Sequence, residues 1–184
     1  KGYVETIECD PLVMREKAQI SIICPRPYIE DLAMIYAELA ATLALFEFPF
    51  AIEEDNPIPF SEATDYPIAE IMNEGDAEAG CIISIEVNDT IQGIKIINTS
   101  TQQFFYLDSA FVDHDKITIS TISGQMGVTR ERGGTKTNIL NYVGANSTWL
   151  RLAPGVNYFT YTIDDGDTED VEITFEATTL YGGV

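Results

Sequence analysis

The sequence contains few basic residues and a single histidine. Its 184 residues include ten Lys and Arg against thirty Asp and Glu, which gives a formal net charge of −20. Binding to nucleic acid needs clustered Lys and Arg to neutralise phosphates, and an anionic membrane surface attracts basic segments. The composition therefore argues against both kinds of partner. We expect neither nucleic-acid binding nor membrane insertion.

The few basic residues are also unevenly placed. Between Pro27 and Ile94 there is no Lys or Arg but fifteen Asp and Glu, and from Leu152 to the end there are seven acids and no base. Net charge bears on solubility and association more than on fold. This segregation indicates either a solvated acidic face or a surface that attracts a basic partner protein.

Cysteines are scarce and widely spaced. Cys9, Cys24 and Cys81 form no CxxC pair, so the sequence suggests neither a zinc site nor a disulfide framework. Cys24 and Cys81 lie in apolar, strand-like segments. We predict that both are buried thiols.

Long apolar runs are lacking as well. The longest candidate, residues 32–50, is interrupted by Glu38 and Glu47, and a membrane-spanning helix needs about 18 apolar residues. No signal peptide opens the chain, so we expect synthesis in a reducing cytoplasm. The chain begins in mid-pattern without a Met, and we interpret it as a fragment of a longer protein.

Short segments of alternating apolar and polar residues, separated by turn signals, dominate the chain. This pattern predicts an antiparallel β-sandwich or jelly roll, and the lack of β-α-β alternation excludes dinucleotide-binding folds. The predicted strands are Gly2–Asp10, Ala18–Cys24, Ile68–Met72, Cys81–Val87, Ile91–Asn98, Gln103–Leu107, Lys116–Ser120, Gln125–Arg132, Thr135–Tyr142, Val156–Ile163 and Val171–Phe175.

Most of the C-terminal apolar residues are predicted to serve packing. Aromatic and branched side chains dominate the burial of apolar area in a β-sandwich. The residues assigned to packing are Trp149, Leu150, Leu152, Phe159, Tyr161, Val171, Ile173 and Phe175.

One segment differs from the rest. Glu30 to Ala41 is rich in Ala, Leu and Glu, and it contains no Gly or Pro. Leu32, Ile35, Tyr36 and Leu39 follow a helical spacing. We therefore predict a short connector helix over this segment.

His114 is the first candidate for chemistry. An Asp-His pair with Asp113 is able to orient an imidazole for base catalysis. Yet the pair lies in a polar turn without a partnered nucleophile, so we interpret it as a surface turn.

The acidic residues near the C-terminus are the second candidate. Asp164, Asp165, Asp167, Glu169 and Asp170 surround Gly166 and offer oxygen ligands for Ca²⁺, but the EF-hand order is absent. A hairpin loop explains them better. Carboxylate pairs suited to a glycosidase are expected in any chain this acidic, and they carry little information.

Two further groups are the basic cluster and the aromatic residues. The cluster Arg130-Glu131-Arg132 precedes Gly133-Gly134-Thr135-Lys136, which lacks the phosphate-loop pattern and a following helix. We interpret it as a basic strand edge able to meet an acidic neighbour. Trp149 and the tyrosines are able to stack on sugars, but burial in a sandwich core accounts for them more simply.

Four stretches, in order, resemble the distal tail protein family of siphophages and their prophages. They are AQISIICPRPYIEDL (Ala18–Leu32), FEFPF (Phe46–Phe50), IMNEGDAEAGCIISIEV (Ile71–Val87) and the C-terminal run, especially WLRLAPGVNYFTY and LYGGV. The resemblance covers nearly the whole chain. It implies an N-terminal β-domain that forms a hexameric ring around the tail channel, and an outer galectin-like β-sandwich.

On this resemblance the chain divides into three parts. Residues 1–29 would be the end of the N-terminal ring (belt) domain, residues 30–48 a helical connector and entry strand, and residues 49–184 the galectin-like sandwich. The sugar site of galectins needs a His-x-Asn-x-Arg strand, whereas His114 is followed by Asp115-Lys116-Ile117-Thr118. The fold alone does not imply sugar binding.

The resemblance implies a virion protein of the tail tip or baseplate that links tail tube to tip and carries other baseplate proteins. We expect no enzymatic activity, no cofactor, and no catalytic or metal-binding residues. The alternative is a carbohydrate-binding module for attachment to the host cell wall. A glycosidase is a more distant third hypothesis.

Overall fold

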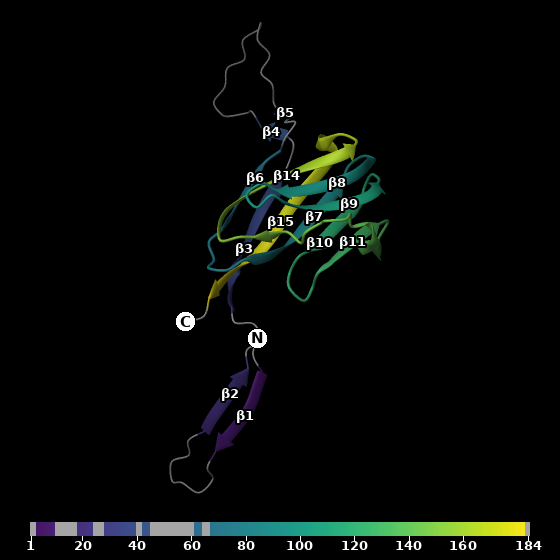
Figure 1. The fold of residues 1–184 in the computed structure, drawn as a ribbon. Helices are drawn as coiled ribbons and strands as arrows, with labels where there is room; N and C mark the ends of the chain where they lie inside the picture. The colour runs from purple at the N-terminus through teal and green to yellow at the C-terminus, as the bar shows by residue number, and fades with distance from the viewer. Residues whose placement is uncertain are drawn as a thin grey trace.

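Two antiparallel sheets pack face to face in the computed structural model and form a β-sandwich (Figure 1). The structure describes residues 3–9, 18–23, 28–39, 42–44, 61–63 and 67–182, with the main chain alone for 42–44 and 61–63. The predicted fold class, a mainly β protein with an antiparallel galectin-like sandwich, is confirmed.

The larger sheet contains seven strands. Its order is β12-β11-β10-β7-β15-β3, with β13 paired to β7 outside this path. The strands are β3 (Tyr28–Leu39), β7 (Ala79–Val87), β10 (Lys116–Ser120), β11 (Gly127–Arg132), β12 (Thr135–Asn138), β13 (Arg151–Leu152) and β15 (Val171–Gly182).

The smaller sheet contains four strands in the order β6-β14-β8-β9. These are β6 (Ala69–Asn73), β8 (Ile91–Asn98), β9 (Gln103–Phe111) and β14 (Gly155–Asp165). The register between β8 and β9 shifts near Gly93, whose φ of +62° suits glycine. A side chain at this position would also collide with the carboxylate of Asp164.

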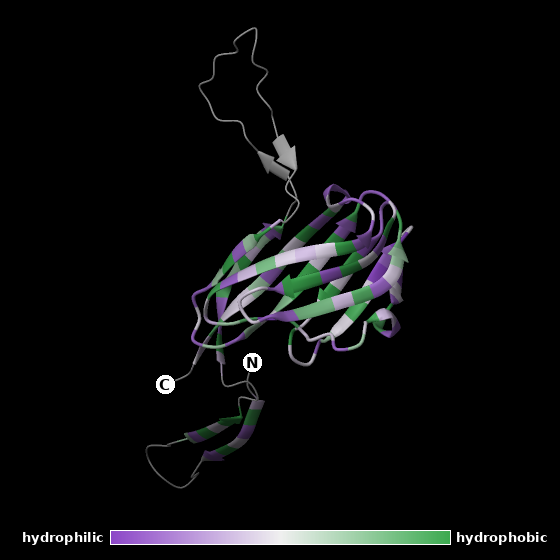
Figure 2. Ribbon diagram, turned by 45° about the horizontal axis from the view of Figure 1, so that its top comes forward, coloured by the Kyte–Doolittle hydropathy of each residue, from purple (hydrophilic) through white to green (hydrophobic). Residues whose placement is uncertain are grey.

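The core lies between the two sheets, and its residues alternate with exposed ones along each strand (Figure 2). In β7 and β15 every second residue is buried, as the alternation of the sequence predicted. The rings of Phe159 and Phe175 join the two sheets with centroids 4.7 Å apart. Of the eight residues assigned to packing, seven are buried, and Trp149 packs half-buried against the core.

The predicted helix over Glu30–Ala41 is wrong, because Tyr28–Leu39 forms strand β3. β3 pairs with β15 in antiparallel register from Ile173 opposite Leu39 to Gly182 opposite Tyr28. The hydrogen bonds that β15 offers outweigh the helical propensity of Ala, Leu and Glu, which is a weak preference. The register shifts between Thr178 and Leu180, where Asp31–Ala33 lie opposite Thr179 alone.

Two short pairs of strands lie outside the two sheets of the sandwich. β1 (Tyr3–Cys9) and β2 (Ala18–Ile23) form a hairpin that extends away from the sandwich (Figure 1). This confirms both N-terminal strand predictions. β4 (Thr42–Ala44) pairs with β5 (Ser61–Ala63). The predicted entry strand around Phe46–Phe50 lies outside the described residues, as does Cys24.

Several predicted strands have different bounds, the largest difference being β15, which was predicted to end at Phe175 and continues to Gly182. β9 continues to Phe111, and the segment predicted as Thr135–Tyr142 ends as a strand at Asn138 and continues as the 3₁₀ turn η1 (Leu140–Tyr142). Cys81 is buried in β7, which confirms its prediction. Burial raises the pKa of its thiol to about 11, so the group behaves as a small apolar side chain.

The contact between the Phe159 and Phe175 rings predicts that removing one of the two rings lowers the stability of the protein strongly. Replacing Phe159 by Ala should lower the free energy of unfolding by about 3–5 kcal/mol, because both buried area and packing are lost. Tyr158 is exposed on the same strand, and Tyr158→Ala should cost about 1 kcal/mol or less. Urea unfolding followed by circular dichroism would measure both, and equal costs would contradict the assignment of Phe159 to the core.

Candidate functional site

His114 lies in the exposed turn between β9 and β10, as the sequence predicted. Its side chain is 88% exposed and contacts the carboxylate of Asp113. Its φ is +67°, a left-handed conformation that suits a turn. This geometry confirms a surface turn.

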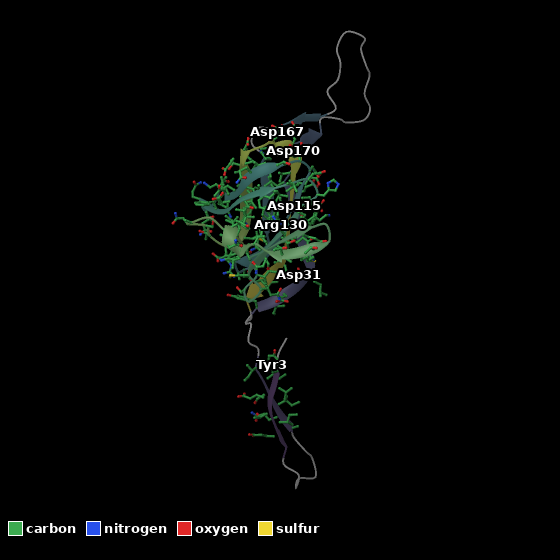
Figure 3. The ribbon with its side chains drawn as sticks, turned by 90° about the vertical axis from the view of Figure 1, so that its right-hand side faces the viewer. Tyr3, Asp31, Asp115, Arg130, Asp167 and Asp170 are labelled. Carbon is green, nitrogen blue, oxygen red and sulfur yellow. The ribbon has the colours of Figure 1, made fainter. Side chains whose placement is uncertain are left out.

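The next residue, Asp115, is buried and was not singled out by the sequence. Its two carboxylate oxygens accept hydrogen bonds from Nε and Nη2 of Arg132, and one also accepts from the backbone N–H of Val112. The pair connects the β9–β10 turn to strand β11, and Figure 3 shows Asp115 close to Arg130 in the body of the sandwich. The acidic neighbour predicted for the basic cluster is therefore Asp115 of the same chain, which binds Arg132.

The electrostatics of Asp115 follow from this contact. Burial disfavours the charged carboxylate, but the hydrogen bonds from Arg132 and Val112 and the nearby charges of Arg132 and Arg130 outweigh it, so the pKa of Asp115 is lowered. The same contact raises the pKa of Arg132. A bidentate Arg–carboxylate pair fixes geometry as well as charge, so we assign the pair a structural role.

The acidic residues after β14 form a hairpin loop, in agreement with the preferred sequence interpretation. Asp167 and Asp170 lie close together at one end of the sandwich (Figure 3), where η2 spans Thr168–Asp170. Asp164 accepts a hydrogen bond from the hydroxyl of Tyr106, which raises the pKa of Tyr106 to about 12. Within the described residues no group of three or more His, Cys, Asp and Glu is arranged to hold a metal ion.

Trp149 is not placed as a sugar platform. Its ring packs on Phe105, with centroids 5.2 Å apart, at the margin of the core. On the outer face of the smaller sheet, Lys95 Nζ lies 4.2 Å from the centre of the Phe104 ring, which is a cation–π contact within one surface. Neither arrangement restores the galectin sugar-binding set that the sequence lacks.

The outer face of the larger sheet carries a row of charges across its strands. Lys136 opposes Glu131, Glu131 opposes Lys116, and Lys116 opposes Glu86. The Lys116–Glu86 ion pair is 2.5 Å long and the Lys136–Glu131 pair 3.5 Å. Exposed pairs of this kind contribute little to stability, about 0–1 kcal/mol each. These charged side chains make this outer face of the sheet polar, and a partner that binds the face would contact them.

A cavity of about 700 Å³ opens at the end of the sandwich where β3 begins and β15 ends. Its lining includes Tyr28, Asp76, Glu78 and Arg151. Arg151 Nη1 lies 3.8 Å from Glu78, and Arg151 Nη2 donates a hydrogen bond to Ser123. The cavity thus combines acids with a guanidinium that side chains of the cavity already engage.

A protein-family model matches residues 74–178, which is more than half of the chain, and its description is siphovirus-type tail component, C-terminal domain. The chain belongs to this family. It is a phage tail component of structural type, and the family resemblance found in the sequence is confirmed. No curated protein matches the chain.

A search of solved structures found a longer protein with a similar fold. The fold is similar to the crystal structure of SPP1 Dit (gp 19.1), described as a paradigm of the hub adsorption apparatus in phages that infect Gram-positive bacteria. The TM-score is 0.66 at 13% sequence identity. The match covers 97% of this chain and 58% of the SPP1 protein, so the chain spans little more than half the length of that relative.

Membership in a structural tail family agrees with the arrangement of the polar groups in this tail component. The buried Asp115 and the buried asparagines Asn73 and Asn157 bind backbone groups or Arg132 of their own chain. No helix among the described residues is long and apolar enough to cross a membrane. Asp115 was missed because only its pairing with a residue 17 positions away identifies it as buried.

The Asp115–Arg132 pair predicts a specific dependence of stability on pH. Because the folded-state pKa of Asp115 lies below its unfolded value of about 3.9, the stabilisation is fully present above that value and is lost as the pH falls through the folded-state pKa. Asp115→Asn should lower the free energy of unfolding at pH 7 by about 1–3 kcal/mol, because Arg132, whose side chain is 44% exposed, loses the charged acceptor of its two hydrogen bonds.

Urea unfolding at a series of pH values from neutral to acid would measure this effect. The difference between the wild-type protein and Asp115→Asn should shrink below about pH 4. Asp113→Asn, in the same turn but exposed, is the matched control and should change stability little. A difference between wild type and Asp115→Asn that stays constant over the acid range would contradict the assignment.

Proposed function

We propose that this protein is a distal tail component that links the tail tube to the tip and carries other baseplate proteins. The observation that carries the proposal is the family match over residues 74–178 together with the fold shared with SPP1 Dit. The β-sandwich would be a rigid domain that projects outward from the ring. The full-length protein would assemble as a hexameric ring around the tail channel.

The N-terminal hairpin supports the proposed division into domains. The described side chains of β1 and β2 are nearly all exposed, including the apolar residues Tyr3, Val4, Ile7, Ile20, Ile22 and Ile23. A two-stranded hairpin is at best marginally stable alone in water. We therefore assign the residues before β3 to the ring domain, which shortens the sequence interpretation of 1–29 by the two residues that pair with β15, and further strands of that domain would cover these side chains.

The sandwich domain is proposed to begin with β3, which replaces the helical connector of the sequence interpretation. β3 is hydrogen-bonded to β15 along its length, so it would transmit force directly from the ring domain into the larger sheet. Residues 40–48 would then lead into the sandwich strands that follow. Synthesis in the cytoplasm of the bacterial host would precede assembly.

A distal tail role predicts that the protein is a stoichiometric part of the virion. Mass spectrometry of purified particles from the host that carries the gene should detect its peptides in fixed ratio to those of the tail-tube protein. A phage whose gene for this protein is disrupted should yield no infectious particles with complete tips. The matched control is a virion-absent protein encoded by the same phage.

The proposal fails if particles contain tube and tip proteins but no peptide of this chain. It also fails if disruption of the gene leaves tail tips intact. Binding of cell-wall polysaccharide by the isolated sandwich, measured on a glycan array, would instead favour the carbohydrate-binding alternative.

A further inference from the structure

The two edge strands of the larger sheet remain without partners within the described part of the chain. β3 pairs with β15 on one side, and β12 pairs with β11 on one side. β3 carries the large exposed apolar side chains Tyr28, Ile29, Leu32, Met34 and Tyr36. A long, exposed apolar edge strand promotes pairing with another chain, so a partner is expected to cover it.

The two edges carry opposite charges. β3 contains Glu30, Asp31 and Glu38 and no basic residue, and Figure 3 shows Asp31 on this strand. β12 contains Lys136 and no acid, and its neighbour β11 contains Arg130, Glu131 and Arg132, of which Arg132 is paired with Asp115. Lys136 stays 74% exposed although it contacts Glu131.

The register places the two key charges on the same face of the sheet. Glu38 opposes Thr174, and the row continues across the sheet through Ser84, Thr118 and Thr129 to Asn138. Lys136 is two residues from Asn138 on β12, so it lies on that same outer face. If a second copy extended the sheet in this register, Glu38 and Lys136 would be diagonal cross-strand neighbours, which long side chains are able to bridge.

The strand directions also suit such an extension. The path from β12 to β3 contains six strands, and every neighbouring pair is antiparallel. A second copy in the same orientation would therefore bring its β12 antiparallel to β3 of the first, and the alternation would continue without a break. Leu140 and Tyr142, exposed just after β12, would add apolar area to meet that of β3.

We propose that β3 of one copy binds β12 of a second copy, so that the larger sheets join head to tail. A symmetric contact between two β3 strands is disfavoured, because it would bring the carboxylates of Glu38 and Asp31 toward those of the partner. A head-to-tail contact uses two different surfaces, and it closes into a ring or continues as a filament according to its rotation. The contact goes beyond the proposed role in the tail tip and does not depend on it.

Sedimentation velocity of the 184-residue chain over a range of concentrations would test the contact. An ionic strength of about 0.15 M screens the repulsion between the distant acidic charges and leaves charge pairs in contact effective. Glu38→Lys and Lys136→Glu should each weaken self-association about tenfold, because each places like charges across the contact.

An equimolar mixture of these two variants should associate like the wild-type protein, since every contact between unlike variants again pairs opposite charges. The double variant in one chain should also regain association. Glu169→Lys, on the η2 turn, changes the net charge as Glu38→Lys does and should leave association unchanged. Circular dichroism of each variant would verify that it folds.

Two results would overturn the proposal. A wild-type chain that remains monomeric up to millimolar concentration would exclude the contact. Loss of association in Glu38→Lys that is not restored by mixing with Lys136→Glu would exclude this pairing of edges. A symmetric β3 contact would instead be unaffected by Lys136→Glu, which lies on the opposite edge of the sheet. None of these outcomes tests the proposed role in the tail tip, which detection of the protein in virions tests separately.

Discussion

The central strands β7 and β15 bury every second side chain between the two sheets, and this apolar layer determines where the other groups of the protein lie. Residues from Ile83 and Ile85 on one sheet to Phe159 and Tyr161 on the other are almost inaccessible to water. Burial of apolar area is the dominant favourable contribution to folding. Because the pleat sends neighbouring residues to opposite faces, the same strands present charges and hydroxyl groups to the solvent.

Polar groups enter this layer only where the chain must turn. Asn73 accepts a hydrogen bond from the N–H of Gly75 and donates to the carbonyl groups of Ala77 and Leu152. Asn157 accepts a hydrogen bond from the N–H of Ala153 and donates one to the carbonyl group of Gly155. Asp115 accepts hydrogen bonds from Arg132. Buried polar groups without partners are costly, so these contacts specify the turns as well as stabilise them. The side chains of Asn73, Asn157 and Asp115 therefore serve the structure of the turns.

The outer surface carries the features to which we assign contacts with other proteins. These are the exposed hairpin, the apolar edge of β3 and the charge row that ends at Lys136, in a chain that belongs to the siphovirus tail family. The net charge of −20 opposes non-specific association, so contacts would form where the few basic residues lie.

The sequence predicted the strands well where one face is buried, as in Val171–Phe175, because burial imposes a period of two. It failed for Tyr28–Leu39, an edge strand exposed on both faces in its first half, whose conformation depends on hydrogen bonds to β15. It also missed Asp115, since a pair of residues brought together by the fold leaves no local pattern. The family resemblance succeeded because ordered motifs carry information that periodicity lacks.

A cryo-electron microscopy reconstruction of the virion tail tip tests the central claim most directly. The account predicts that the β-sandwich formed by residues 28–39 and 67–182 fits density outside a ring at the distal end of the tail tube, and that the β1–β2 hairpin is part of that ring. A reconstruction that places this chain elsewhere in the particle, or that resolves the complete tip without it, would contradict the account.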